Sequence, residues 1–174
     1  MKTAFEKIAH FNELIGNGRN MAQAEQLKVQ FEMIREEFEE LEGVLDAYLS
    51  FNWALCAPEE RGDAGEHMLT HIRDGIADVL VTTYGLAHRL GVDADADLDA
   101  VYASNMSKFV EGEKQSYAAQ IEITQRLGIA TTVAKTAPGL YAITSSRDQV
   151  GKDGKQYPKG KLLKPASYRE PEFT

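Results

Sequence analysis

The sequence predicts an all-α protein, a helical bundle with a small irregular or β-hairpin appendage at its C-terminal end. Apolar residues recur at helical spacing over most of residues 4–109. Segments rich in glycine or proline interrupt this pattern, and the two short β-like runs both follow residue 130. A chain of 174 residues is typical of one domain, so we expect residues 1–174 to form one.

The first expected helix covers residues 4–15 and stops at Gly16-Asn17-Gly18. The second, roughly 22–51, has an apolar stripe whose steps alternate four and three, as in a bundle seam. The stripe consists of Leu27, Phe31, Ile34, Phe38, Leu41, Leu45 and Tyr48. A turn-rich connection at 57–63 leads to a third helix, roughly 64–90, which is apolar on two sides. One chain has too few helices to cover both sides, so we expect a homodimer or homotetramer.

A fourth helix is expected at 97–109 and a more polar fifth at 113–127. Residues 131–134 and 140–144 read as strands of a hairpin around Ala137-Pro138-Gly139. The chain after Gly151 is basic and loop-like. We therefore expect a helical core over about 1–111, an insertion over about 112–150 and a basic C-terminal segment, 151–174.

Charge and composition exclude several classes of protein. The net charge of −8 argues against a binder of nucleic-acid polymers, which would be basic. No apolar run approaches the ~20 residues that cross a bilayer, and the first residues lack the apolar core of a signal peptide. The lone Cys56 permits neither an internal disulfide nor a Cys-rich zinc site. We expect a cytoplasmic protein, located in the host cytoplasm if a phage encodes it.

The second helix carries a dense run of glutamates. At 100° per residue, Glu37 and Glu40 lie on the same side of its apolar stripe, with Glu36 close by. Glu39 and Glu42 fall on the other side. Most such runs form a solvated acidic face, and that interpretation suits Glu39 and Glu42 well.

The third helix offers Asp74 and Asp78, one turn apart. Asp78 stands inside the apolar run 76–81, where an acid must be neutralised, hydrogen-bonded or bound to a metal. Carboxylates from two helices suit a hard cation such as Mg²⁺, which in turn suits a substrate with phosphates. A zinc site of His67, His71 and Asp74 is an alternative that fits less well.

Four segments, in this order, resemble the MazG-like all-α nucleoside triphosphate pyrophosphohydrolases. Residues 36–40 resemble their E-E-x-x-E motif, and residues 73–80 resemble their second acidic helix. Residues 104–109 resemble their Asn/Lys motif. The basic residues of 153–165 resemble the tail of the phage-type branch, which is related to phosphoribosyl-ATP pyrophosphohydrolase-like proteins.

The resemblance implies hydrolysis of an NTP or dNTP between the α- and β-phosphates, giving the monophosphate and pyrophosphate. It implies Mg²⁺ bound by Glu37, Glu40 and Asp78, with Asp74 as a supporting ligand, and Mn²⁺ is expected to substitute. Glu36 is the expected base that activates water. The family usually has a glutamate where this chain has Gly75, which makes Asp74 the candidate replacement.

Phosphate binding is expected from Asn105 and Lys108 on the fourth helix and from Lys161, Lys164 and Tyr168 in the basic segment. That segment is expected to fold over the mouth of the site, although a disordered basic tail is the common alternative. The resemblance to the phage-type branch leads us to expect a deoxynucleotide as the substrate. The competing function is a non-catalytic helical regulatory or interaction protein that keeps the bundle.

Overall fold

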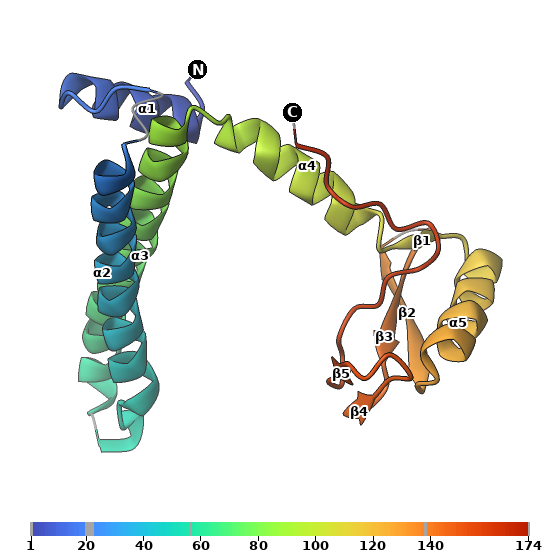
Figure 1. Cartoon of the computed structure of the whole chain (residues 1–174). Helices are drawn as coiled ribbons and strands as arrows, with labels where there is room; N and C mark the ends of the chain where they lie inside the picture. The colour runs from blue at the N-terminus through green and yellow to red at the C-terminus, as the bar shows by residue number, and fades with distance from the viewer. Residues whose placement is uncertain (1, 20–22, 56, 138, 174) are drawn as a thin grey trace. The chain divides into compact units, whose positions relative to one another are not determined.

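The computed structural model describes residues 2–19, 23–55, 57–137 and 139–173 (Figure 1). It is mostly helical, with small antiparallel sheets near the C-terminus, which confirms the predicted class. The chain divides into two compact units, Met1–Asp95 and Ala96–Thr174, and each is described by itself. The single domain expected from the length stays a prediction, and Cys56 lies outside the described residues.

The first unit contains α1 (Ala4–Leu14), α2 (Ala24–Ser50), the short 3-10 helix η1 (Trp53–Leu55) and α3 (Pro58–Leu90). Thr3 begins α1 with a capping box, in which its hydroxyl accepts from the Glu6 backbone N–H and the Glu6 carboxylate accepts from the Thr3 N–H. Gly91 ends α3 in the left-handed conformation, with φ at 77°.

The turn-rich connection expected at 57–63 is largely wrong, because α3 already begins at Pro58. A proline is compatible with the first turn of a helix, since its missing N–H would have no intrahelical acceptor there. The sequence pattern around Pro58 and Gly62 was therefore a helix start rather than a loop.

α2 and α3 form an antiparallel pair (Figure 1). Near the start of α2, the Gln30 side-chain amide donates to the Thr82 carbonyl and its oxygen accepts from Arg89 Nε, both at 2.9 Å. Gln30, Thr82 and Arg89 are all buried. This end of the pair is thus held by polar contacts, whose hydrogen bonds offset the cost of burial.

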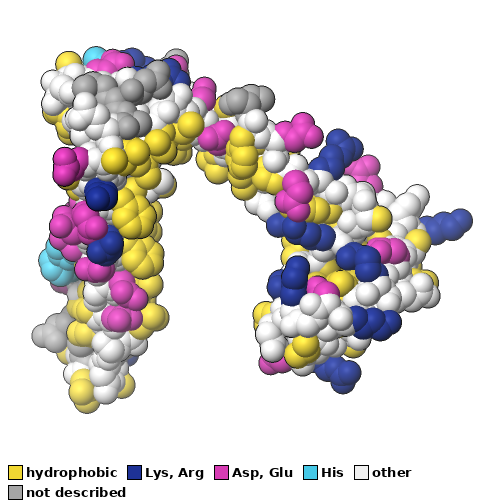
Figure 2. All heavy atoms as spheres, in the orientation of Figure 1, with side chains coloured by type: hydrophobic (Ala, Val, Ile, Leu, Met, Phe, Trp, Pro, Cys, Tyr) yellow, Lys and Arg dark blue, Asp and Glu magenta, His cyan; other side chains and the backbone are white. Residues whose placement is uncertain are grey.

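Three of the seven residues in the apolar stripe expected to face the interior, Phe31, Phe38 and Leu45, are exposed. Among the described residues of the first unit, Phe5 is the only large hydrophobic side chain that is buried. Ten of the described large apolar residues on α2 and α3 are between 41% and 70% exposed, namely Val29, Phe31, Met33, Phe38, Leu45, Leu49, Leu69, Ile76, Leu80 and Leu90. Figure 2 shows hydrophobic side chains along this helix pair. Two long helices cannot enclose a core by themselves.

The second unit contains most of α4 (Ala94–Met106), then β1 (Val110–Glu111), α5 (Glu113–Leu127), β2 (Thr131–Ala137), β3 (Leu140–Ser145), β4 (Gln149–Val150) and β5 (Gln156–Tyr157). The predicted hairpin is confirmed, since β2 and β3 pair antiparallel, while Pro138 lies outside the described residues. The short β1 adds to β3, giving the order β1-β3-β2. β4 and β5 form a separate two-stranded sheet.

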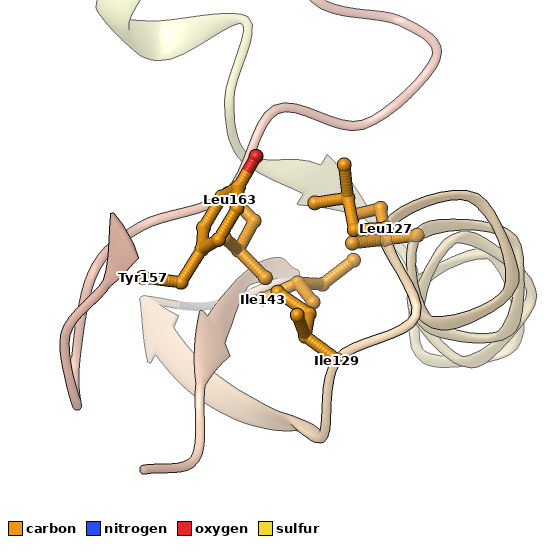
Figure 3. Packing of buried hydrophobic residues seen from close by; sticks show 6 residues of the cluster. Leu127, Ile129, Ile143, Tyr157 and Leu163 are labelled. Atoms are coloured by element: carbon orange, nitrogen blue, oxygen red, sulfur yellow. The ribbon is translucent and has the colours of Figure 1, made fainter. Parts of the chain in front are cut away.

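The core of the second unit lies between α5, the three-stranded sheet and the C-terminal segment (Figure 3). Its members are Ile123, Leu127, Ile129, Ile143, Tyr157 and Leu163. The Leu163 N–H donates to the Ile143 carbonyl at 2.8 Å, and Leu162 forms a β-bridge with Thr144. The basic segment is therefore anchored in the core rather than free. In the described ranges, no helix is long and apolar enough to cross a membrane.

Candidate functional site

The helix pair of the first unit brings the five predicted acids into one electrostatic cluster. Burial raises the pKa of Glu37 above its ordinary value of 4.5. The negative charges of Asp78, Glu40, Glu36 and Asp74 raise this pKa further, in that order. The effect of Asp78 on Glu37 is the largest of these, so the two half-buried acids face each other across the helix pair.

The remaining acids lie at the rim of this cluster. Glu36, Glu40 and Asp74 are exposed, whereas Asp78 is half-buried, as expected from its apolar neighbours. Among the described residues, no group of three or more His, Cys, Asp or Glu side chains is arranged to hold a metal ion. A bound ion would therefore have to draw the carboxylates together.

Gly75 lies against α2 rather than beside the acids. It occupies the position where the resemblance leads us to expect a glutamate. A Cβ atom there would lie 3.3 Å from the Leu41 side chain. The helices approach closely at this point because position 75 has no side chain. The acid next to it, Asp74, faces the rim and contributes to the potential at Glu37.

In the second unit, four of the five predicted phosphate-binding residues lie together around the Tyr168 ring. Lys164 Nζ is 4.0 Å from the ring centroid, and Lys108 Nζ is 5.9 Å from it. Lys108 also donates to Asn105 Oδ1 at 2.6 Å. Both lysines are within the range of cation–π attraction.

Glu170 completes this cluster. Tyr168 Oη and Lys164 Nζ donate to its two carboxylate oxygens, at 2.8 Å and 3.1 Å. Hydrogen bonds from Tyr168 and then Lys164 lower the pKa of Glu170, and bonds to Tyr168 and then Glu170 raise the pKa of Lys164. Lys164 is therefore held in its charged form.

Lys161, the fifth predicted residue, belongs to a neighbouring group. Its Nζ lies 4.8 Å from the centroid of the Tyr157 ring and donates to the Gln156 carbonyl at 3.1 Å. Tyr157 Oη donates to Asp153 at 2.8 Å, which lowers the pKa of that carboxyl. Asp153 is thus already engaged by a neighbour.

These lysines share one basic cavity of about 350 Å³. Its charged lining residues are Lys108, Arg126, Lys155, Lys161 and Lys164, with Asp153 as the carboxylate. Figure 2 shows Lys and Arg side chains gathered on this unit. Five cations around one carboxylate, on a chain with a net charge of −8, favour an anionic ligand.

Two cations of this cavity, Arg126 and Lys155, were missed from the sequence. Arg126 ends a polar helix, where a basic residue is common, and its Nη2 donates to the Lys164 carbonyl at 2.7 Å. Lys155 belongs to the basic segment 153–165, whose density of positive charge is the signal for it in the sequence.

The serines of the 104–109 motif were also missed. Ser104 Oγ donates to the Arg169 carbonyl at 2.8 Å, and Ser107 Oγ accepts from the Arg169 N–H at 2.9 Å. They fasten the end of the chain to α4 beside a cavity of about 800 Å³. Part of the motif therefore positions the C-terminal segment.

Part of the chain is similar to a known protein family. Residues 63–122 match the sequence model of the MazG-like family, and no curated protein is significantly similar in sequence to this chain. The matched range contains Asp74, Asp78, Asn105 and Lys108, but neither the glutamates of α2 nor the basic cavity's tail lysines. Proteins of this family are typically NTP pyrophosphohydrolases that use a divalent metal. The predicted resemblance is confirmed over this range, in which the chain is similar to the MazG-like family.

Proposed function

We propose that this protein is a Mg²⁺-dependent pyrophosphohydrolase that cleaves an NTP or dNTP between its α- and β-phosphates, with a deoxynucleotide as the favoured substrate. The main support is the acid cluster of α2 and α3. Burial and then the charges of four neighbouring carboxylates raise the pKa of Glu37, and a bound cation would relieve the repulsion among these acids. The family match over Asp74 and Asp78 points the same way.

The donor set fits Mg²⁺, because hard cations prefer carboxylate oxygens. Glu37, Glu40 and Asp78 would hold the ion, with Asp74 as a supporting ligand. When bound, Mg²⁺ neutralises the charge of a triphosphate and lowers the pKa of a coordinated water. Mn²⁺ would serve the same set.

Glu36 is the proposed general base. It is exposed and lies one turn from Glu40, on the rim of the cluster. Its carboxylate would take a proton as the water oxygen bonds to phosphorus. The bridging P–O bond then breaks and its electron pair leaves with pyrophosphate.

The basic cavity of the second unit is assigned to phosphate groups. Lys108, Lys161 and Lys164 line it together, and Asn105 holds Lys108. Cations where negative charge develops are a common means of stabilising phosphoryl transfer. Tyr168 would fix the position of Lys164 through its ring and through Glu170.

A second copy of the chain is the proposed partner for the exposed apolar face of α2 and α3. Ten exposed large apolar side chains among the described residues of one helix pair are more than a stable monomer usually leaves in water. Pairing two such helix pairs would give a four-helix arrangement with an apolar interior. Dimer and tetramer are both compatible with this face.

The test is release of pyrophosphate from a panel of NTPs and dNTPs, with and without Mg²⁺. Phosphorus NMR separates pyrophosphate from orthophosphate and so identifies the bond that breaks. The Glu37→Gln variant should lose most activity, and Glu42→Gln, from the same acidic run, should keep it.

If no nucleotide of the panel is hydrolysed with Mg²⁺ or Mn²⁺, the proposed activity is wrong. The helical regulatory or interaction protein then becomes the better interpretation. Release of orthophosphate instead of pyrophosphate would assign a different reaction to the same acids.

A further inference from the structure

His67 and His71 lie one turn apart on α3, and both are exposed. Their Nε2 atoms are 3.3 Å apart, with the ring planes at 89° and the ring centroids 4.6 Å apart. One imidazole thus donates to the other in the absence of a ligand. Both Nε2 atoms belong to exposed side chains.

This separation matches that of two ligands on a transition metal. Two imidazole nitrogens at ~2.05 Å from a tetrahedral Zn²⁺ are about 3.3 Å apart. Histidines at positions i and i+4 of a helix are a known way to present such a pair. Both rings are exposed, so a metal could reach them without any rearrangement of the core. Its binding would replace the hydrogen bond between the two imidazoles.

The surroundings favour a cation and leave room for its water ligands. The two histidines line a cavity of about 500 Å³ together with Glu39 and Glu40. Figure 2 shows histidine and acidic side chains next to one another on this helix pair. Among the described residues, no group of three or more His, Cys, Asp or Glu side chains is placed to hold a metal ion. Water would therefore complete the coordination of an ion bound by the two histidines.

We propose that His67 and His71 form a binding site for a borderline transition-metal ion, of the class of Zn²⁺, Ni²⁺ and Cu²⁺, with water as the remaining ligands. The site lies next to Glu40, one of the carboxylates assigned to Mg²⁺, and differs from the Mg²⁺ site in its imidazole ligands. Imidazole suits these ions and discriminates against Mg²⁺, so both sites can be filled from a mixture. The proposal does not depend on the proposed hydrolysis.

The experiment is calorimetric titration of the full chain with Ni²⁺ and Zn²⁺ in the presence of excess Mg²⁺. His67→Ala and His71→Ala should each weaken binding by at least the roughly tenfold that even second-shell changes cost. His10→Ala, an exposed histidine on α1, is the matched control and should bind as the unchanged protein does. The ¹⁵N resonances of both imidazoles should shift on addition of Zn²⁺.

Unchanged affinity in the His67→Ala, His71→Ala double variant would overturn the proposal. So would equal loss of Ni²⁺ binding in Glu37→Gln, because the ion would then occupy the carboxylates. Mg²⁺-dependent pyrophosphate release should survive in both histidine variants. A protein that binds Ni²⁺ as expected but hydrolyses no nucleotide would refute the proposed function and leave this site intact.

Discussion

Gly75 lies directly against Leu41, and a Cβ atom at position 75 would be 3.3 Å from both Cβ and Cδ1 of that leucine. The two helices pack closely at this point, between the acids of α2 and those of α3. The contact bears on the glutamate that the resemblance leads us to expect at position 75. A glutamate at position 75 would begin its side chain inside the helix contact, so the glycine favours close packing over an additional ligand.

Replacing Gly75 by glutamate should destabilise the first unit rather than improve the metal site. Overpacking of this kind should lower the free energy of unfolding, measured in urea, by about 1–3 kcal/mol. Gly43→Ala is the matched control, since no atom lies within 4 Å of a Cβ at that helical position. It should be neutral or stabilising, by up to roughly 1 kcal/mol. A Gly75→Glu variant as stable as the original would contradict the close contact.

Glu37→Gln should raise the melting temperature at pH 7 in the presence of EDTA. The raised pKa means that the ionised Glu37 carboxylate is less favourable in the folded than in the unfolded state. The resulting loss of stability begins as the pH rises through about 4.5, the ordinary pKa of the group, and is complete above the pKa in the folded state. The advantage of the variant should therefore vanish on acidification below that window. Added Mg²⁺ should stabilise the original protein more than the variant.

The same change should lower kcat/KM for the preferred nucleotide by roughly tenfold to a hundredfold or more, the range seen when metal sites are disturbed. The control change Glu42→Gln should alter neither kcat/KM nor the melting temperature. Equal turnover in Glu37→Gln and the original protein would remove Glu37 from the metal site.

Lys164→Ala should raise KM for the nucleotide while leaving the melting temperature nearly unchanged. The lysine is exposed, and its ion pair with Glu170 is of the kind that contributes ~0–1 kcal/mol to stability. The comparison is Lys159→Ala, which removes a charge from the same segment but not from the cavity lining. If both variants raise KM equally, general electrostatic attraction is sufficient and the cavity has no special role.

Leu163→Ala should destabilise the second unit by about 2–5 kcal/mol, because Leu163 is 2% exposed in the core. Val150→Ala, at a 56% exposed position, should have little effect on thermal unfolding. Deleting residues 151–174 is therefore a poor test of the tail's role in binding, since it also removes Tyr157 and Leu163 from the core. A stable Leu163→Ala variant would mean that the segment is only loosely attached.

Leu45→Glu and Leu80→Glu should lower the mass measured by sedimentation equilibrium at micromolar concentration and reduce helix content. Each places a charge in the apolar face assigned to a second copy, where it would be buried without a partner. Val150→Glu, an exposed apolar residue in the second unit, should retain the oligomer. A monomeric mass for the original protein would show that another molecule, or none, covers this face.

The sequence by itself determined the helical class, the bounds of α5 to the residue, the hairpin and the family resemblance. These depend on local periods of 3.6 and 2 and on motifs short enough to read along the chain. It also predicted that Glu37 and Glu40 would face Asp74 and Asp78, because helical spacing puts each acid on a definite face, while their metal-binding role stays a prediction. It misread Pro58, since a proline signals both a turn and the first turn of a helix.

Only the tertiary structure showed what depends on contacts between distant residues. It packed Gly75 on Leu41, added Arg126 and Lys155 to the basic cavity, and buried Leu163 under Ile143. It also left exposed three residues of the apolar stripe that periodicity assigns to an interior, because periodicity reports that a face is apolar but not which molecule covers it. The convergence of the His67 and His71 nitrogens likewise depends on side-chain rotamers, which no spacing rule fixes.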